Sequence, residues 1–217
     1  MSWKIGQVKK LNIVIVTGLR KKALAAAALL LLIAPAALAA QQVQVVLDPA
    51  RTTIDWALDA TLHTVHGTFK LKSGTILFDP VSGNAGGEIV VDATSGESDN
   101  HSRDNKMHKD VLESSRYPEI TFLPKHVLGK LNDKGLSNLQ VQGIFHVHGA
   151  DHDMTLAIPV QANGADVTAT SDFSIPYQAW GMKNPSTFFL KVDNRVEIKI
   201  AAAGKLATTG MAASNNK

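Results

Sequence analysis

The sequence predicts an all-β, antiparallel domain that carries one short helical insertion. Runs of alternating apolar and polar residues recur along the chain, and this is the period of a strand with one buried face. Turn signals rich in glycine, asparagine, aspartate and proline separate the runs, as expected for hairpin-linked strands. Only residues 94–117 interrupt this rhythm at length. Roughly eight to ten strands result, and both a β-sandwich and a closed barrel fit the pattern.

We expect residues 1–39 to be a cleaved signal peptide. Six basic residues precede a short apolar run, which ends in the small residues Ala37 and Ala39 around Leu38. The alternative is a retained membrane anchor, but the apolar run is shorter than the roughly 20 residues that a spanning helix needs. The sequence thus predicts an exported, periplasmic protein with a folded domain over residues 40–204 and a disordered tail over 205–217.

The distribution of charge argues against a nucleic-acid-binding protein. The chain has 22 basic and 19 acidic residues, but six of the basic ones lie in the expected signal peptide, so the remainder has a net charge of −3. A nucleic-acid-binding domain is expected to be basic. The chain has no cysteine, so this exported domain does not depend on disulfides.

Five strands are expected before the insertion. In the second of them Ile54, Trp56 and Leu58 share one face, opposite Asp55 and Asp59. A turn at residues 72–74 separates the third strand from the fourth and makes a hairpin with one apolar and one basic face. The strands cover residues 41–47, 53–59, 65–71, 75–78 and 88–92.

Residues 94–117 are expected to form an irregular loop that leads into one short helix. Ser98 or Asp99 can cap the amino end of this helix. Met107 and Val111 lie at helical spacing, and the helix must stop before Pro118. Beyond it the alternation returns and predicts strands over residues 120–123, 139–147, 154–160, 167–175 and 188–200.

Each predicted strand places large apolar residues on one face. The pattern alone leaves open whether these side chains fill a core, which is the commoner case, or line a cavity. An eight-stranded barrel is just wide enough to hold one small ligand. The residues are Ile54, Trp56, Leu58, Phe69, Leu71, Ile76, Phe78, Phe122, Phe145, Val147, Met154, Leu156, Ile158, Phe173 and Phe188, with Trp180 in the loop after residue 175.

Three histidines raise the alternative of a metal-dependent enzyme. His146 and His148 share one face of a strand, and His152 lies just past the following turn, so three imidazoles could meet at a zinc ion. However, this face is opposite Phe145 and Val147, and we favour solvent-facing histidines. The chain has neither a G-x-S-x-G nor an H-E-x-x-H motif. We expect no catalysis, no bound metal and no cofactor.

Several short motifs resemble the YceI-like family. They are VHGTF at 65–69, G-x-I-x-FDP at 74–80, Ser-Gly at 95–96 with Arg-Asp at 103–104, RYPEITF at 116–122 and V-x-G at 141–143. Together they extend the resemblance over about residues 45–200. The sequence departs from the family at LDPART, residues 47–52, and at residues 97–102, where the family usually has Thr-Gly-Asn.

The resemblance implies a lipocalin-like antiparallel barrel of eight strands or slightly more. It also implies an apolar channel for polyisoprenoids, isoprenoid quinones or other long-chain amphiphiles. It therefore favours a cavity lined by the apolar strand residues named above, from Ile54 to Phe173, and by Trp180. Residues 96–117 would gate the mouth of this channel, with Arg103, Asp104 and His108 as weak candidates for head-group contacts. We expect Arg103 and Asp104 to form an ion pair that fastens the insertion.

The implied role is binding, storage or transport of such a lipid, with transient contact to the membrane or to a membrane protein. Two alternatives remain open beside it. One is the metal-dependent enzyme, and the other is a non-catalytic partner module of a membrane redox or stress complex, which would show a packed core and an exposed apolar patch. Whether the barrel forms a homodimer is also open.

Overall fold

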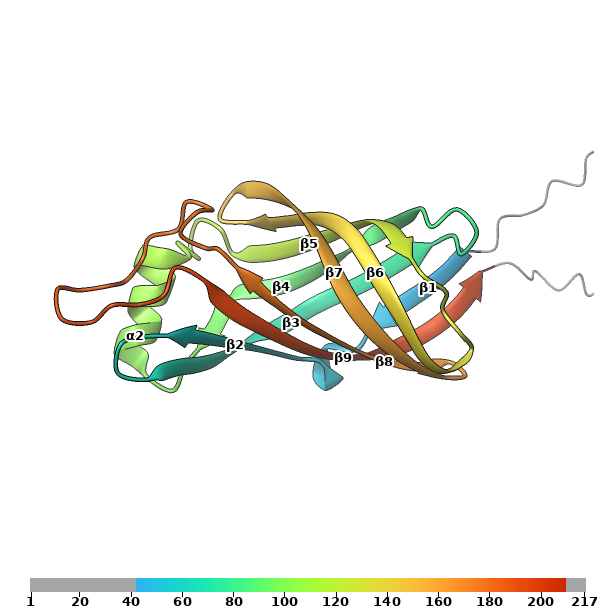
Figure 1. The fold of residues 1–217 in the computed structure, drawn as a ribbon, viewed down its shortest axis with the longest axis horizontal. Coiled ribbons are helices and arrows are strands. Elements are labelled where there is room, and N and C mark those ends of the chain that lie inside the picture. Colours follow the sequence, from blue (N-terminus) through green and yellow to red (C-terminus); the bar gives the residue numbers. More distant parts are fainter. Residues whose placement is uncertain (1–41, 210–217) are drawn as a thin grey trace, which may run out of the picture. The chain divides into compact units, whose positions relative to one another are not determined.

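The computed structural model describes residues 42–209, and these form a closed antiparallel β-barrel (Figure 1). The predicted all-β fold is confirmed, as a barrel and not as a sandwich. Its strands are β1 (Gln42–Leu47), β2 (Thr53–Asp59), β3 (Thr64–Phe78), β4 (Ala85–Glu97), β5 (Glu119–Leu128), β6 (Lys134–Val147), β7 (Ala150–Asn163), β8 (Asp166–Ile175) and β9 (Val196–Thr209). The helical segments are a 3₁₀ turn, η1 (Pro49–Arg51), and α2 (His101–Lys106), which continues into a π-helical turn, η2 (Met107–Val111).

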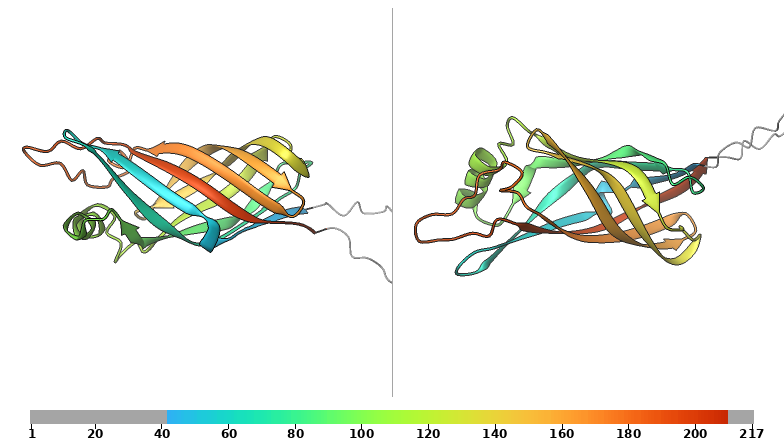
Figure 2. Two further views of the ribbon diagram at one scale, coloured as in Figure 1. Left: turned by 90° about the horizontal axis from the view of Figure 1, so that it is seen from below. Right: turned by 45° about the horizontal axis from the view of Figure 1, so that its top comes forward.

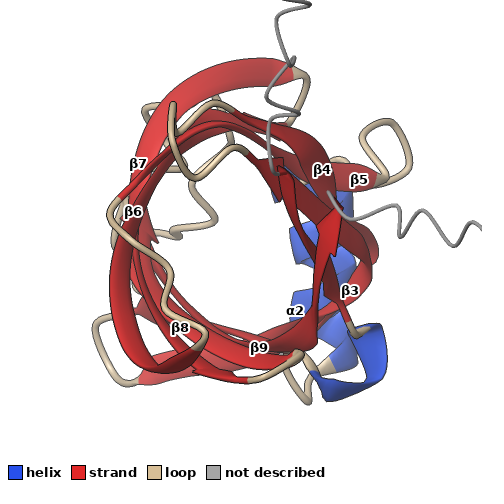
Figure 3. Cartoon of the chain, turned by 90° about the vertical axis from the view of Figure 1, so that its right-hand side faces the viewer, coloured by secondary structure: helices blue, strands red, loops and turns tan. Residues whose placement is uncertain are grey.

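Eight strand positions close the barrel, and β1 and β2 share one of them. The order around the ring is β3-β2-β9-β8-β7-β6-β5-β4, and β4 pairs with β3 to close it (Figure 3). β2 fills the place between β3 and β9 in one half of the barrel, and β1 fills the same place in the other half. Gln42 pairs with Thr209, so the two ends of the described chain meet at the end of the barrel away from α2.

β3 is one long strand where the sequence predicted a hairpin. The turn expected at residues 72–74 is wrong, because the chain continues straight and only shifts its register against β4 between Leu71 and Ser73. A Cβ at Gly74 would lie 2.7 Å from the side chain of Leu47. This glycine therefore makes room for β1 and does not turn the chain.

Two boundaries in the last third of the chain also differ from the prediction. β9 begins at Val196, and the segment around Phe188 is a loop in which this side chain is 87% exposed, so its expected inward position is wrong. Residues 205–209, expected in the disordered tail, belong to β9. The expected signal peptide, residues 1–39, and residues 210–217 lie outside the described part of the chain. Within residues 42–209 no helix is long and apolar enough to cross a membrane.

The barrel interior differs between its two halves. Phe78, Phe122, Val127 and Val141 are at most 6% exposed and pack in the half that contains β1. At the other end, α2 and the loop between β8 and β9 lie over the opening, as the further views confirm (Figure 2). The half of the barrel with the larger unfilled space lies beneath these two segments.

Candidate functional site

Two apolar cavities lie inside the barrel. The larger, about 480 Å³, lies beneath α2, and the smaller, about 140 Å³, lies deeper, toward β1. Along three strands the boundary between them falls between successive inward residues: Trp56 and Ile54 on β2, Ile120 and Phe122 on β5, and Ile198 and Ile200 on β9. The cavities therefore follow one another along the barrel axis.

The predicted lining residues divide between these cavities. The larger is lined by Trp56, Leu58, Phe69, Phe145 and Val147. The smaller is lined by Ile54, Leu71, Ile76, Phe78, Phe122, Leu156 and Ile158. Met154, Phe173 and Trp180 line neither, although all three are packed against the core.

Phe173 and Trp180 support the wall of the larger cavity from behind Phe145. The ring centroid of Phe145 lies 6.4 Å from that of Phe173 and 5.9 Å from that of Trp180. Edge-to-face and tilted contacts at these distances are favourable between aromatic rings. Phe145 is thus held in place on one side and faces the cavity on the other.

The three histidines do not form a metal site. His146 faces outward and its Nδ1 lies 2.6 Å from a carboxylate oxygen of Asp151, and His148 packs against Tyr117 with ring centroids 4.8 Å apart. His152 is the cross-strand partner of Phe145 and therefore points inward, contrary to the expected surface position. In residues 42–209 no group of three histidine, aspartate, glutamate or cysteine side chains could hold a metal ion.

His152 is instead part of the aromatic wall. Its ring stacks on Trp180 with the centroids 3.9 Å apart and the planes within 6°. Its Nε2 is buried without a hydrogen-bond partner among the described residues, and burial lowers the pKa of this imidazole. A neutral ring is the form that suits this apolar surrounding.

α2 covers one side of the mouth and is fixed tightly to β4. Asn100, and not the predicted Ser98 or Asp99, caps the helix, because its Oδ1 accepts a hydrogen bond from the backbone N–H of Arg103 at 3.1 Å. His108 lies at hydrogen-bond distance from Gly96 O (2.8 Å) and Ser114 Oγ (2.9 Å). Both ring nitrogens are thus engaged, so His108 anchors the insertion and does not face the cavity.

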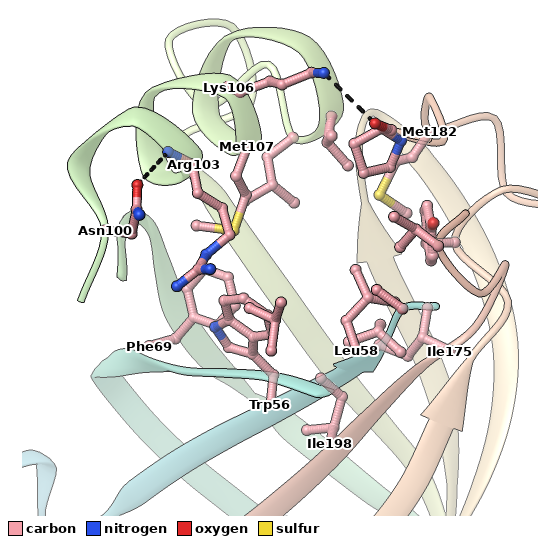
Figure 4. A pocket seen from close by; sticks show the side chains of 18 of the residues that line it. Trp56, Leu58, Phe69, Asn100, Arg103, Lys106, Met107, Ile175, Met182 and Ile198 are labelled. Carbon is pink, nitrogen blue, oxygen red and sulfur yellow. Dashed lines mark hydrogen bonds between the residues drawn. The ribbon is translucent and has the colours of Figure 1, made fainter. Parts of the chain in front are cut away.

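Arg103 lines the larger cavity, whereas Asp104 does not. The direct ion pair expected between them is wrong, because the hydroxyl of Ser98 lies between the two side chains. This hydroxyl donates to Asp104 and accepts from Arg103 Nε at 2.7 Å. Arg103 Nη2 also donates to the carbonyl of Ser98 at 2.5 Å. Figure 4 shows the guanidinium reaching from α2 down into the cavity, above Phe69 and Trp56.

The loop between β8 and β9, residues 176–195, covers the other side of the mouth. Tyr177 and Met182 are each 4% exposed and line the larger cavity. The Tyr177 hydroxyl donates to Asp193 O at 2.6 Å, and burial raises the pKa of this phenol to about 12. Lys106 Nζ reaches from α2 to Pro185 O at 3.5 Å, so the two covers touch across the opening (Figure 4).

Reasoning from alternation missed the part of the wall that comes from non-strand segments. The segment from η2 to Leu112 and the loop between β8 and β9 contribute eight apolar or aromatic residues that no period of two could identify. They are Met107, Val111, Leu112, Tyr177, Met182, Pro185, Leu190 and Val192. The available signal was the presence of large apolar residues inside segments that are otherwise polar.

A model of the YceI-like domain matches residues 46–203 of the chain. No curated protein sequence matches it. The fold is similar to that of BcnA from Burkholderia cenocepacia, with a TM-score of 0.59, 18% identity, and coverage of 72% of this chain and 98% of BcnA.

Two further solved structures share the fold. One is a polyisoprenoid-binding domain from Saccharophagus degradans, with a TM-score of 0.59, 13% identity, and coverage of 75% of this chain and 98% of that domain. The other is a YceI protein from Campylobacter jejuni, with a TM-score of 0.54, 19% identity, and coverage of 67% of this chain and 86% of the other.

Proposed function

Because the chain belongs to the YceI-like family, we propose that its barrel binds a long-chain amphiphile, such as a polyisoprenoid, an isoprenoid quinone or a similar lipid. The observation that carries the proposal is the apolar cavity of about 480 Å³ beneath α2. Cavities of roughly 300–1,000 Å³ with apolar walls and a few polar groups are typical small-molecule sites. The solved polyisoprenoid-binding domain of the same fold supports this ligand class.

The wall of the cavity suits a hydrocarbon tail. Aromatic and aliphatic side chains from β2, β3, β6, β8 and β9 surround it, with Met107 and Met182 at the mouth. Each methylene group that leaves water for such a surrounding contributes about 0.8 kcal/mol. Thioether side chains adapt to irregular ligands. Binding therefore needs few polar contacts, and the role is binding, storage or transport without catalysis.

An exposed apolar patch beside the mouth supports contact with a membrane. Phe188 and Phe189 are 87% and 88% exposed and pack edge to face against each other, while Leu62 is 81% exposed. The backbone of Thr61 donates to Lys191 O at 2.9 Å, which holds the hairpin of Leu62 against the loop of the two phenylalanines. Aromatic rings flanked by lysine favour the interface of a lipid bilayer. We propose that a periplasmic barrel takes up and releases its lipid there.

Native mass spectrometry of the protein purified from membranes, together with uptake of a fluorescent isoprenoid, tests the proposed function. We expect a co-purified lipid and saturable uptake. Phe145→Arg places a charge in the cavity wall and should abolish uptake, whereas Val81→Arg, at a loop position that is 93% exposed, should not change it. If the unaltered protein takes up no lipid, the proposal is wrong.

Flotation with anionic vesicles tests the membrane contact separately. The double variant Phe188→Ser, Phe189→Ser should float less than the unaltered protein, and the Val81→Ser control should float equally well. Uptake of a lipid dispersed in detergent should be the same in all three proteins. Equal flotation of the double variant would exclude the patch as the membrane contact.

A further inference from the structure

Both charged side chains that line the larger cavity are basic. They are Arg103 and Lys106 of α2, and within the described residues no carboxylate belongs to the lining. No carboxylate oxygen lies within 4.0 Å of the Arg103 guanidinium in residues 42–209. Arg103 reaches a carboxylate only through the hydroxyl of Ser98, which bonds to Asp104, and Lys106 is exposed to solvent. The charged groups at the cavity wall therefore favour an anionic ligand group.

The guanidinium of Arg103 is held in a fixed orientation. Ser98 accepts from Nε through its hydroxyl and from Nη2 through its carbonyl, and Ser98 itself is 5% exposed. Nη1 makes no hydrogen bond within residues 42–209. Arg103 lines the cavity, and in Figure 4 its guanidinium lies beneath α2 and above Phe69. Because Ser98 also bonds to Asp104, the arginine is positioned before any ligand arrives.

Trp56 forms part of the apolar wall of the same cavity. Its side chain is 6% exposed and lines the same cavity, and its Nε1 is buried without an acceptor among the described residues. In Figure 4 this indole lies beneath the Arg103 guanidinium. The N–H has almost no accessible surface, so Trp56 offers the cavity the carbon atoms of its ring and no hydrogen-bond donor.

We propose that the amphiphile carries an anionic head group, a carboxylate or a phosphate, that pairs with Arg103. The proposal rests on the lipid-binding function proposed above and specifies its ligand. A guanidinium presents parallel N–H donors that match the oxygens of both groups. Lys106 is within reach at the rim, since its single contact to Pro185 O is long, at 3.5 Å. The tail then extends past Leu58 and Phe145 toward the deeper cavity.

Ligand pairs with the same tail and different head groups test the proposal. Geranylgeranyl phosphate is compared with geranylgeraniol, and oleic acid with oleyl alcohol, by competition against a fluorescent lipid. We expect the anionic member of at least one pair to bind about tenfold more tightly or better, as charge-assisted hydrogen bonds allow. Preference in the first pair alone identifies a phosphate, and preference in the second alone identifies a carboxylate.

Variants assign the preference to Arg103. Arg103→Gln should remove the preference for the anionic ligand. Arg103→Lys keeps the positive charge but loses the two N–H donors that bond to Ser98, so it should retain part of the preference. Arg116→Gln is the matched control, because Arg116 lies in the same insertion but outside the lining. Circular dichroism and thermal unfolding of each variant establish that the fold is intact.

The outcomes separate this proposal from the one on which it depends. Equal binding of anionic and neutral ligands would overturn the anionic head group, and a preference that survives Arg103→Gln would overturn its pairing with Arg103. Both outcomes leave lipid binding in place. Loss of the preference in Arg116→Gln as well would also overturn the assignment to Arg103. If none of the four ligands binds the unaltered protein, lipid binding itself fails.

Discussion

The volume of the larger cavity predicts the length of hydrocarbon that the barrel accommodates. An apolar protein cavity of about 150 Å³ holds one benzene, or about 25 Å³ per carbon atom. At that density the cavity of about 480 Å³ takes about 19 carbon atoms, close to four isoprene units. The smaller cavity, about 140 Å³, adds room for about one more unit, but only if the side chains between the cavities move.

A series of prenyl alcohols with two, three, four, six and eight isoprene units measures this limit without reference to the head group. Each unit that enters the cavity buries five carbons, worth up to about 4 kcal/mol. Part of this is lost to ordering of the tail, so we expect at least about a tenfold gain in affinity per unit. The gain should end at about four units. Competition against a fluorescent isoprenoid gives each dissociation constant.

Phe122→Ala should move the limit to longer tails. Phe122 lines the smaller cavity and is the cross-strand partner of Phe145, which lines the larger one. The substitution removes six carbons, or about 150 Å³, and joins this space to the smaller cavity. Together these spaces take about twelve carbons, so the gain in affinity should continue to about six units.

The same substitution has a cost in stability that must be measured beside it. Truncating a buried phenylalanine destabilises a protein by about 3–5 kcal/mol, so denaturant unfolding has to show that the variant is folded at the assay temperature. Val81→Ala, in an exposed loop, should leave both the limit and the stability unchanged. Continued tenfold gains up to eight units in the unaltered protein, or no gain between two and four, would refute the volume argument.

Three further predictions concern the walls and the mouth. Burial lowers the pKa of His152, so as the pH falls this imidazole is protonated in the unfolded chain before it is protonated in the folded one. The melting temperature should therefore fall as the pH drops below about 6.5, and it should fall less in His152→Gln. The pKa of Tyr177 is raised to about 12, so stability should be lost as the pH rises from 10 to about 12. Tyr177→Phe loses the hydrogen bond to Asp193 O and should lower the free energy of unfolding by about 1 kcal/mol at neutral pH, as measured by urea titration. Gly67→Ala would place a Cβ 2.3 Å from the indole of Trp56. It should therefore destabilise the barrel by about 1–3 kcal/mol and shift the tryptophan emission. Unchanged stability and unchanged emission would contradict this close contact.

The strands were predictable because burial alternates along them with the period of the backbone. Trp56, Phe69 and Phe145 point inward as their positions in the alternation require. Gly74 was misread, since a glycine near lysine and serine is equally compatible with a turn and with a position where a neighbouring strand passes closely. Only the pairing of β3 with both β1 and β4 decides between these two.

The mouth of the cavity was less predictable, because its residues come from segments without a regular period. Phe188 fits the alternation that leads into β9, yet it lies in the loop and is exposed. Met182, six residues earlier, is buried against the cavity. The position of Arg103 depends on the hydroxyl of Ser98, a tertiary contact that spacing along the chain does not reveal.

The pairing of Gln42 with Thr209 has a practical consequence. Any reporter, affinity handle or surface tether joined to either end of the folded domain emerges at the pole opposite the entrance. Such an attachment leaves α2 and the loop after β8 unobstructed. The two ends are also near enough to be joined by a short peptide linker. A circular permutant could then have its new termini elsewhere, such as at the hairpin between β6 and β7.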